Sequence, residues 1–186
     1  MGIDVVSLEI PDVKIIKVSK FGDHRGFFSE TYNKKAFAEA GIEIDFVQDN
    51  QSYSAAVGTV RGLHYQGAPF AQDKLVRVLK GRILDVAVDI RRSSPTFGKW
   101  VAAEISAAEW NQILVPVGFA HGIITLEPDT ELFYKVSNFY SPTHDFGIRW
   151  NDLALGIDWP FSEADAQLSD KDKRQPLFSE VVHFFD

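Results

Sequence analysis

Five histidines are the side chains in this chain best suited to chemistry near neutral pH, and two of them lie in strand-like segments. His64 belongs to VRGLHYQ, where an alternating pattern predicts that it shares one face with Val60, Gly62 and Gln66. His121 belongs to PVGFAHGI, which alternates in the same way. Two such histidines converge if their strands form one barrel. The alternative is that each is an ordinary hydrogen-bonded histidine of the core or surface.

Charged side chains accompany both histidines. Arg61 and Lys74 flank the first, and in the next predicted hairpin Asp85 shares a face with Ala87 and Asp89. If that face points into a barrel, it places a carboxylate in the interior, where an unpaired charge is costly. If it points outward, the same pattern is the polar face of a sheet. Both interpretations remain open at this point.

The spacing around these residues partly resembles the metal site of cupin jelly rolls, which combine H-x-H, a Glu and a later P-x-G-x-x-H. The last piece is present as Pro116, Gly118 and His121. The first is replaced by HYQ at 64–66, and Lys74 stands near the position of the acidic ligand. Gln is a weak ligand, and an ammonium group opposes a divalent cation. The pattern therefore predicts a cupin barrel without a metal site.

Proton transfer next to a carbonyl group is the chemistry that these residues fit. A histidine can act as base or acid, Tyr134 and Tyr140 in ELFYKVSNFY can supply phenolic protons, and Lys74 can stabilise a developing oxyanion. The chain has no cysteine, so thiolate metal sites and cysteine nucleophiles are excluded. The motifs G-x-S-x-G, G-x-x-x-x-G-K-[ST] and G-x-G-x-x-G are missing, which argues against a hydrolase elbow, a P-loop and a Rossmann site.

Length and composition restrict the class of protein to which this site belongs. The chain has 186 residues, 45% of them hydrophobic, which suits a single domain spanning 1–186. A formal net charge of −7 disfavours binding to a nucleic-acid polymer. No apolar stretch is long enough to predict a membrane helix, and the N-terminal segment lacks the basic start of a signal peptide. A cytoplasmic location away from the membrane is therefore expected.

Short alternating runs separated by Gly and Pro turn signals predict many strands and one early helix. The helix is expected after Asn33 and closes at Gly41. These elements predict an all-β, cupin-type jelly roll (double-stranded β-helix) with a few short helices. Residues 151–186 lose the alternation and are expected to form a looser C-terminal extension packed on the barrel. The strands are expected at 13–18, 26–32, 44–51, 59–65, 74–79, 82–90, 99–105, 112–115, 120–126 and 132–139.

Eight segments of the sequence, in order, are characteristic: FGDHRGFFSETYN, FVQDNQSYS, VRGLHYQ, AQDKLVRVLKG, ILDVAVDIRRSSPTFGKW, VPVGFAHGIITL, ELFYKVSNFYSP and WNDLALGIDWP. Through these segments, the sequence from about Phe21 to Asp172 resembles the dTDP-4-dehydrorhamnose 3,5-epimerase family. The resemblance implies an isomerase without a cofactor that works as a homodimer on a dTDP-4-keto-6-deoxyhexose. The expected reaction converts dTDP-4-dehydro-6-deoxy-D-glucose to dTDP-4-dehydro-L-rhamnose, by inversion at C3 and C5, in dTDP-L-rhamnose biosynthesis.

The resemblance also implies roles for individual residues. His64 is expected to be the base and Asp172 of SDKD its orienting partner, although Asp170 of the same motif is an alternative. Tyr134 is expected to be the acid on the opposite face, and Lys74 is expected near the C4 oxygen. The substrate-binding residues implied are Arg25, Glu30, Gln48, Asp49, Asn50, Arg61, His121, Tyr140, Asp145 and Lys171.

Within this binding set, the resemblance assigns three finer roles. Arg25 and Arg61 are expected to bind the pyrophosphate, for which a planar guanidinium is suited. Tyr140 is expected to stack on the thymine, and Asp145 stands where a Glu is expected.

Three other functions remain open. A mono-epimerase acting at C3 or C5 alone would use the same residues. A sugar-nucleotide binding module would keep the pocket without turnover. A metal-dependent cupin oxygenase would need ligands that the histidine pattern does not supply.

Overall fold

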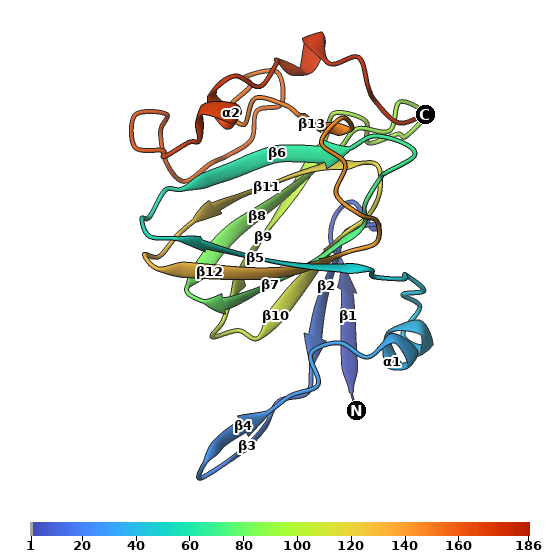
Figure 1. The fold of residues 1–186 in the computed structure, drawn as a ribbon, viewed down its shortest axis with the longest axis vertical. Coiled ribbons are helices and arrows are strands. Elements are labelled where there is room, and N and C mark those ends of the chain that lie inside the picture. Colours follow the sequence, from blue (N-terminus) through green and yellow to red (C-terminus); the bar gives the residue numbers. More distant parts are fainter. Residues whose placement is uncertain (1) are drawn as a thin grey trace.

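Alternating apolar and polar residues form the strands of two facing antiparallel sheets (Figure 1). The computed structural model describes residues 2–186. The larger sheet has the order β1 (Ile3–Ser7), β2 (Lys14–Val18), β10 (Asn111–Val115), β7 (Lys74–Lys80), β12 (Thr130–Val136) and β5 (Gln48–Ser54). The smaller sheet has the order β13 (Asp145–Gly147), β6 (Val60–Gln66), β11 (Phe119–Thr125), β8 (Arg82–Asp89) and β9 (Trp100–Ser106).

The main hydrophobic core lies between these two sheets. Side chains one residue apart along each strand alternate between the core and the outer face, and β-branched residues dominate the inward set. This arrangement confirms the predicted all-β jelly roll. The inward residues include Val76, Val78, Ile83, Val101, Ile105, Ile113, Phe119, Ile123 and Leu132.

The C-terminal segment covers the outer face of the five-stranded sheet, and its red and orange ribbon lies above β6 in Figure 1. Trp159 packs against Trp150 and donates an indole hydrogen bond to its carbonyl oxygen at 2.8 Å. Trp100 of β9 donates in the same way to the carbonyl of Leu155 at 3.1 Å. The indole donors satisfy backbone acceptors that the packing buries, so this segment is fixed on the sheet.

The remaining elements are short. α1 (Lys34–Glu39) buries Phe37 against the outer face of the six-stranded sheet, while α2 (Asp170–Lys173) and the 3-10 turn η1 (Phe178–Glu180) belong to the C-terminal segment. β3 (Phe21–Asp23) and β4 (Gly26–Phe28) form a hairpin that stands away from both sheets (Figure 1). None of the helices in residues 2–186 has the length and apolar character that crossing a membrane requires.

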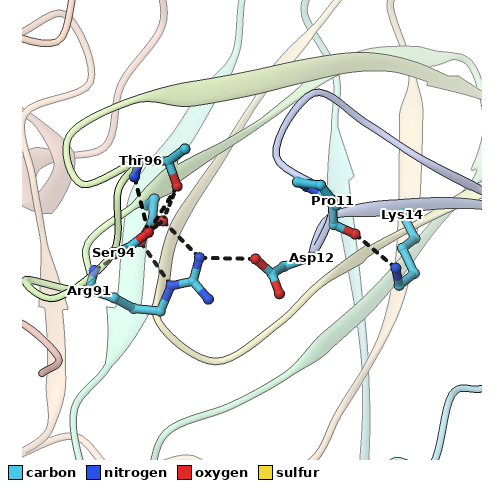
Figure 2. Close-up of polar contacts among 7 residues, drawn as sticks. Pro11, Asp12, Lys14, Arg91, Ser94 and Thr96 are labelled. Atoms are coloured by element: carbon cyan, nitrogen blue, oxygen red, sulfur yellow. Dashed lines mark hydrogen bonds and ion pairs between the residues drawn. The ribbon is translucent and has the colours of Figure 1, made fainter.

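A buried carboxylate joins the N-terminal turn to the loop after β8. Asp89 is fully buried and accepts hydrogen bonds from the side chains of Arg91, Ser94 and Thr96, at 2.6 to 2.7 Å from the two hydroxyls and from Nη2. Arg91 also bonds Asp12, in the turn between β1 and β2, at 3.1 Å (Figure 2). Burial opposes ionisation of Asp89, but these hydrogen bonds prevail and lower its pKa to about 2.

The predicted helix is confirmed, because the Asn33 side chain accepts a hydrogen bond from the Ala36 amide at 3.2 Å and so caps α1. Most predicted strands are present within two residues of their expected ends. The strand expected over 26–32 stops at Phe28, and the one expected over 44–51 starts only at Gln48. β1, β3 and β13 were not predicted. β3 and β13 have only three residues each, and in β1 (IDVVS) two consecutive valines interrupt the alternation.

Candidate active site

A bulge in β6 sets the geometry of the site. His64 pairs with His121 of β11, but the next register pair joins Arg61 to Ile123, so β6 carries one extra residue between them. The bulge turns Arg61 to the same inward side as His64. Val60, in contrast, belongs to the outer cluster with Trp150, although it also borders the cavity described below. The predicted face shared by Val60 and His64 is therefore wrong, because strict alternation fails at a bulge.

Two glycines allow the strands to approach at this point. A Cβ built on Gly62 would lie only 2.5 Å from the Cα of Gly122 on the neighbouring strand. Gly62 also has a φ of +137°, which side chains rarely adopt. Glycine is thus required at the bulge for both space and conformation.

A cavity of about 480 Å³ opens between the two sheets at this bulge. Strands of both sheets and the segment around α2 contribute to its walls. All four residues predicted to be catalytic, His64, Tyr134, Asp172 and Lys74, line it. The other lining residues are Ser52, Thr59, Val60, Arg61, Val76, His121, Ile123, Leu132, Gln167, Leu168, Ser169 and Lys171.

His64 forms a dyad with Asp172. Its Nε2 lies 2.5 Å from Oδ1 of Asp172, whose other oxygen accepts the Ser169 hydroxyl at 2.7 Å. Asp172 is almost fully buried, which opposes its ionisation, but the hydrogen bonds from His64 and Ser169 prevail and lower its pKa. Asp170, the alternative partner, is 87% exposed and pairs with Lys173. The structure therefore brings Asp172 and not Asp170 to His64.

His121 forms a second dyad, with Asp85. Its Nε2 lies 2.9 Å from both carboxylate oxygens of Asp85, which is completely buried. The face of β8 that carries Asp85 therefore points inward, which settles the question left open by the sequence. A buried carboxylate with a ring N–H partner fixes which imidazole nitrogen carries the proton.

Lys74 and Tyr134 complete the interior of the cavity. Lys74 Nζ lies 3.4 Å from the His64 carbonyl oxygen, and burial lowers the pKa of its ammonium to about 8. Tyr134 projects from β12, which lies in the same sheet as Lys74 and opposite to the sheet of His64, and burial raises the pKa of its hydroxyl. A phenol with a raised pKa remains protonated at neutral pH and can donate a proton to carbon.

Arg61 lies along one wall, where its position is fixed by two contacts. Its guanidinium donates to Ser54 Oγ at 3.2 Å and to the Tyr53 carbonyl at 2.9 Å. Lys171 is a second cation of the wall, and it pairs with Asp145 at 2.5 Å. The cavity therefore offers cations that an anionic ligand can meet.

The residues expected to hold the nucleotide gather partly beside this cavity. Tyr140 is 57% exposed, and its hydroxyl donates to Asp145 at 3.0 Å. The Tyr140 amide donates to Oε1 of Gln48 at 3.1 Å, and Gln48 in turn bonds Asn50 at 2.9 Å. Lys171 joins this group through Asp145.

Three further predicted binding residues belong neither to this group nor to the cavity lining of their own chain. Arg25 is in the projecting hairpin, where it is exposed and pairs with Asp23. Glu30 accepts a hydrogen bond from Asn33 at the start of α1. Asp49 pairs with Lys135 at 2.8 Å on the outer face of β5, because neighbours in a strand alternate in direction.

The wall built by Thr59, Gln167 and Leu168 was not foreseen from the sequence. A short parallel bridge joins Thr59 to Gln167, with the Val60 amide donating to the Gln167 carbonyl at 2.9 Å. Ser52 on β5 is likewise a lining residue that gave no signal. Within residues 2–186, no group of three or more His, Asp or Glu side chains is arranged to hold a metal ion.

Comparison with known proteins gives the family. The family model described as dTDP-4-dehydrorhamnose 3,5-epimerase matches residues 7–180. The chain belongs to this family. The dTDP-4-dehydrorhamnose 3,5-epimerase of Sinorhizobium fredii is 52% identical over 175 residues, covering 94% of this chain and 89% of the relative. The family assignment agrees with the resemblance read from the sequence.

Solved structures of the family share the fold. The epimerase of Bacillus anthracis, with TDP and PPi bound, superposes with a TM-score of 0.91 at 49% identity, covering 95% of this chain and 99% of the other. The Legionella pneumophila enzyme in complex with dTDP-4-keto-L-rhamnose gives 0.92 at 43% identity, with coverages of 97% and 95%. A 3'-monoepimerase from Streptomyces bikiniensis in complex with dTDP-quinovose is less similar, at 0.85 and 31% identity, with coverages of 93% and 87%.

Proposed function

We propose that the chain converts dTDP-4-dehydro-6-deoxy-D-glucose to dTDP-4-dehydro-L-rhamnose by inverting C3 and C5. The observation that carries this proposal is the His64–Asp172 dyad in a cavity that Tyr134 enters from the opposite sheet. A base and an acid on opposite walls are what inversion at carbon requires. The family membership given above supports the same activity.

The proposed mechanism follows from the chemistry of the substrate. The C4 ketone acidifies the C–H bonds at C3 and C5, so a base can remove either proton and leave an enolate. His64 takes the proton, since Asp172 holds Nε2–H and leaves the other ring nitrogen basic. Lys74 and His121 stabilise the negative charge at the C4 oxygen. Tyr134 returns a proton to the opposite face, and no electron is transferred to any cofactor.

The binding roles follow from charge and shape. Arg61 and Lys171 supply positive charge for the pyrophosphate, and Tyr140 offers an exposed ring on which the thymine stacks. Gln48, Asn50 and Asp145 supply polar groups beside that ring.

Proton NMR in D₂O tests the reaction. Purified protein and substrate should give product with deuterium at both C3 and C5. Deuterium at one carbon alone would reject the double epimerase in favour of the mono-epimerase. The relatives support the double epimerase, since the 3'-monoepimerase is 31% identical whereas the family members described above are 43 to 52% identical.

The remaining alternatives have separate tests. A non-catalytic binding module would bind dTDP but exchange no carbon-bound hydrogen. A metal-dependent oxygenase would lose activity after chelation, whereas the proposed epimerase keeps it. Fractionation of cells tests the expected cytoplasmic location.

We also propose a homodimer in which the β3–β4 hairpin lies on a second copy. The hairpin stands away from its own sheets and exposes Phe21, Phe27 and Phe28, each more than half exposed. Exposed aromatic side chains on a projecting element favour a protein partner. Such docking would bring Arg25 and Glu30 toward the partner's cavity, although they lie outside their own. Sedimentation should give a dimer, and replacing the three phenylalanines by serine should give a monomer with weakened dTDP binding.

A further inference from the structure

Gln66 is a buried polar residue to which the proposed mechanism gives no role. It lies on β6, two residues after His64, and is only 5% exposed. Its amide makes three hydrogen bonds, all to backbone groups. Nε2 donates to the carbonyls of Phe70 at 2.6 Å and Phe139 at 3.1 Å, while Oε1 accepts the Ser141 amide at 2.7 Å.

Two of these bonds lie on either side of Tyr140. The Phe139 carbonyl precedes that residue and the Ser141 amide follows it, so the Gln66 amide pairs with the backbone as a neighbouring strand would. The third bond, from Nε2 to the Phe70 carbonyl, connects the loop after β6 to the same Gln66 amide. The Gln66 side chain therefore holds the backbone on both sides of Tyr140.

The exposed ring of Tyr140 depends on this backbone for its direction. Its own further contacts are the amide bond to Gln48 and the hydroxyl bond to Asp145. Its ring is otherwise open to solvent, with 57% exposure. An aromatic ring binds a flat base more tightly when its position is already fixed, because binding then costs less conformational entropy.

We propose that Gln66 is a positioning residue that holds Tyr140 ready to stack on the thymine base. This inference rests on the proposed function, because it takes the ligand to be a thymidine nucleotide. Gln66 is not among the residues that line the cavity. It acts through the segment at residues 139–141.

The test compares dTDP with inorganic pyrophosphate, which carries no base. Gln66→Met removes all three hydrogen bonds, and Gln66→Glu places an oxygen against two carbonyl oxygens while keeping the side-chain shape. Either variant should raise the Kd for dTDP about tenfold, as loss of such bonds implies, and leave the Kd for pyrophosphate unchanged. The KM should rise in parallel, with kcat changed less than about twofold.

Gln112→Glu is the matched control. Gln112 is equally buried and its Nε2 also donates to a backbone carbonyl, that of Thr31 at 2.9 Å, but it does not line the cavity. This variant should leave dTDP affinity unchanged. In a Tyr140→Ala background, the Gln66 substitutions should have no further effect on dTDP affinity, because the residue through which they act is gone.

Three results would contradict the inference. Equal weakening of dTDP and pyrophosphate would show that Gln66 supports the whole cavity. An undiminished effect in the Tyr140→Ala background would show that it acts elsewhere. Unchanged dTDP affinity in Tyr140→Ala alone would overturn the stacking role itself, while the deuterium test of epimerisation would be unaffected. If Gln66→Met does not fold, Gln66→Glu provides the same comparisons.

Discussion

At the scale of residues, the two histidines of the cavity are held by carboxylates in different ways. His64 meets one oxygen of Asp172, whereas His121 lies at 2.9 Å from both oxygens of Asp85. In each pair, Nε2 faces the carboxylate and must carry its proton when the ring is neutral. The Nδ1 atom is then the basic nitrogen, and Asp172 makes His64 a base of defined direction.

Replacing Asp172 by Asn should lower kcat by about 10²- to 10⁴-fold, because the base loses the group that fixes its tautomer. Asp170→Asn is the matched control on the same helix, and its exposed side chain predicts a change of less than about twofold. Steady-state kinetics on both variants, with thermal unfolding to confirm the fold, measures the difference. Similar losses in the two variants would contradict the dyad.

The pH dependence of kcat/KM should report the ionisation of the Lys74 ammonium group. Burial lowers the pKa of its ammonium to about 8, so the group is charged below this pH and neutral above it. If the charge stabilises the enolate, kcat/KM should fall as pH rises through about 8. Lys74→Arg should remove this fall up to pH 10, since a guanidinium stays protonated. A fall at the same pH in Lys74→Arg would assign it to another group.

At the scale of elements, the bulge in β6 places the catalytic base. Gly62→Ala should destabilise the protein by more than about 2 kcal/mol and abolish most activity, because the added Cβ meets Gly122 and the residue needs φ of +137°. Gly156→Ala is the control. It has a φ of +58° but nothing within 4 Å of a Cβ, so it should cost about 1 kcal/mol and leave kcat unchanged. Urea unfolding and kinetics measure both. Equal losses of unfolding free energy in the two variants would contradict the steric requirement for glycine at position 62.

The same bulge shows where prediction from the sequence stops. Alternation predicted the central strands, and the residue type of Asn33 predicted the helix cap, since each depends on local residues. It could not predict that Arg61 turns inward, because the extra residue is defined only by the partner strand. The inward direction of Asp85 was likewise undecided until the partner strand carrying His121 was in place.

At the scale of the whole molecule, Asp89 is connected to the N-terminal turn through Arg91, which binds both Asp89 and Asp12. The charge of Asp89 should therefore contribute to the stability of the fold in acid. Its pKa is lowered to about 2 from an ordinary value near 3.8. The ionised group therefore stabilises the fold above pH 4, by about 2 kcal/mol, and this contribution is lost as pH falls through about 2.

Urea unfolding between pH 1.5 and 7 checks this prediction. Asp89→Asn should be less stable than the wild type at neutral pH, and the difference should shrink below pH 3. Asp12→Asn removes only the half-exposed partner of Arg91 and should cost less than about 1 kcal/mol. A difference that stays constant with pH would contradict the role of the Asp89 charge.

The cavity of the folded molecule is assembled from segments that are distant in the sequence. The C-terminal segment was predicted to pack on the barrel, but its wall at residues 167–169 could not be read from a region without periodicity. Arg25 and Asp49 were expected at the site from resemblance, and the structure places them outside the cavity of their own chain. A sequence pattern identifies a residue's type and neighbours but not which surface it finally faces.

In the proposed mechanism, His64 removes hydrogen from the carbons beside the C4 ketone. The most direct test is the rate at which substrate takes up deuterium in D₂O, measured by proton NMR for the wild type, His64→Ala and His183→Ala. His183 stacks on Phe146 outside the cavity and serves as the histidine control. We expect rapid exchange in the wild type and the control, and at least a 10²-fold slower exchange in His64→Ala, with dTDP affinity retained. Wild-type exchange in His64→Ala would contradict the proposed mechanism.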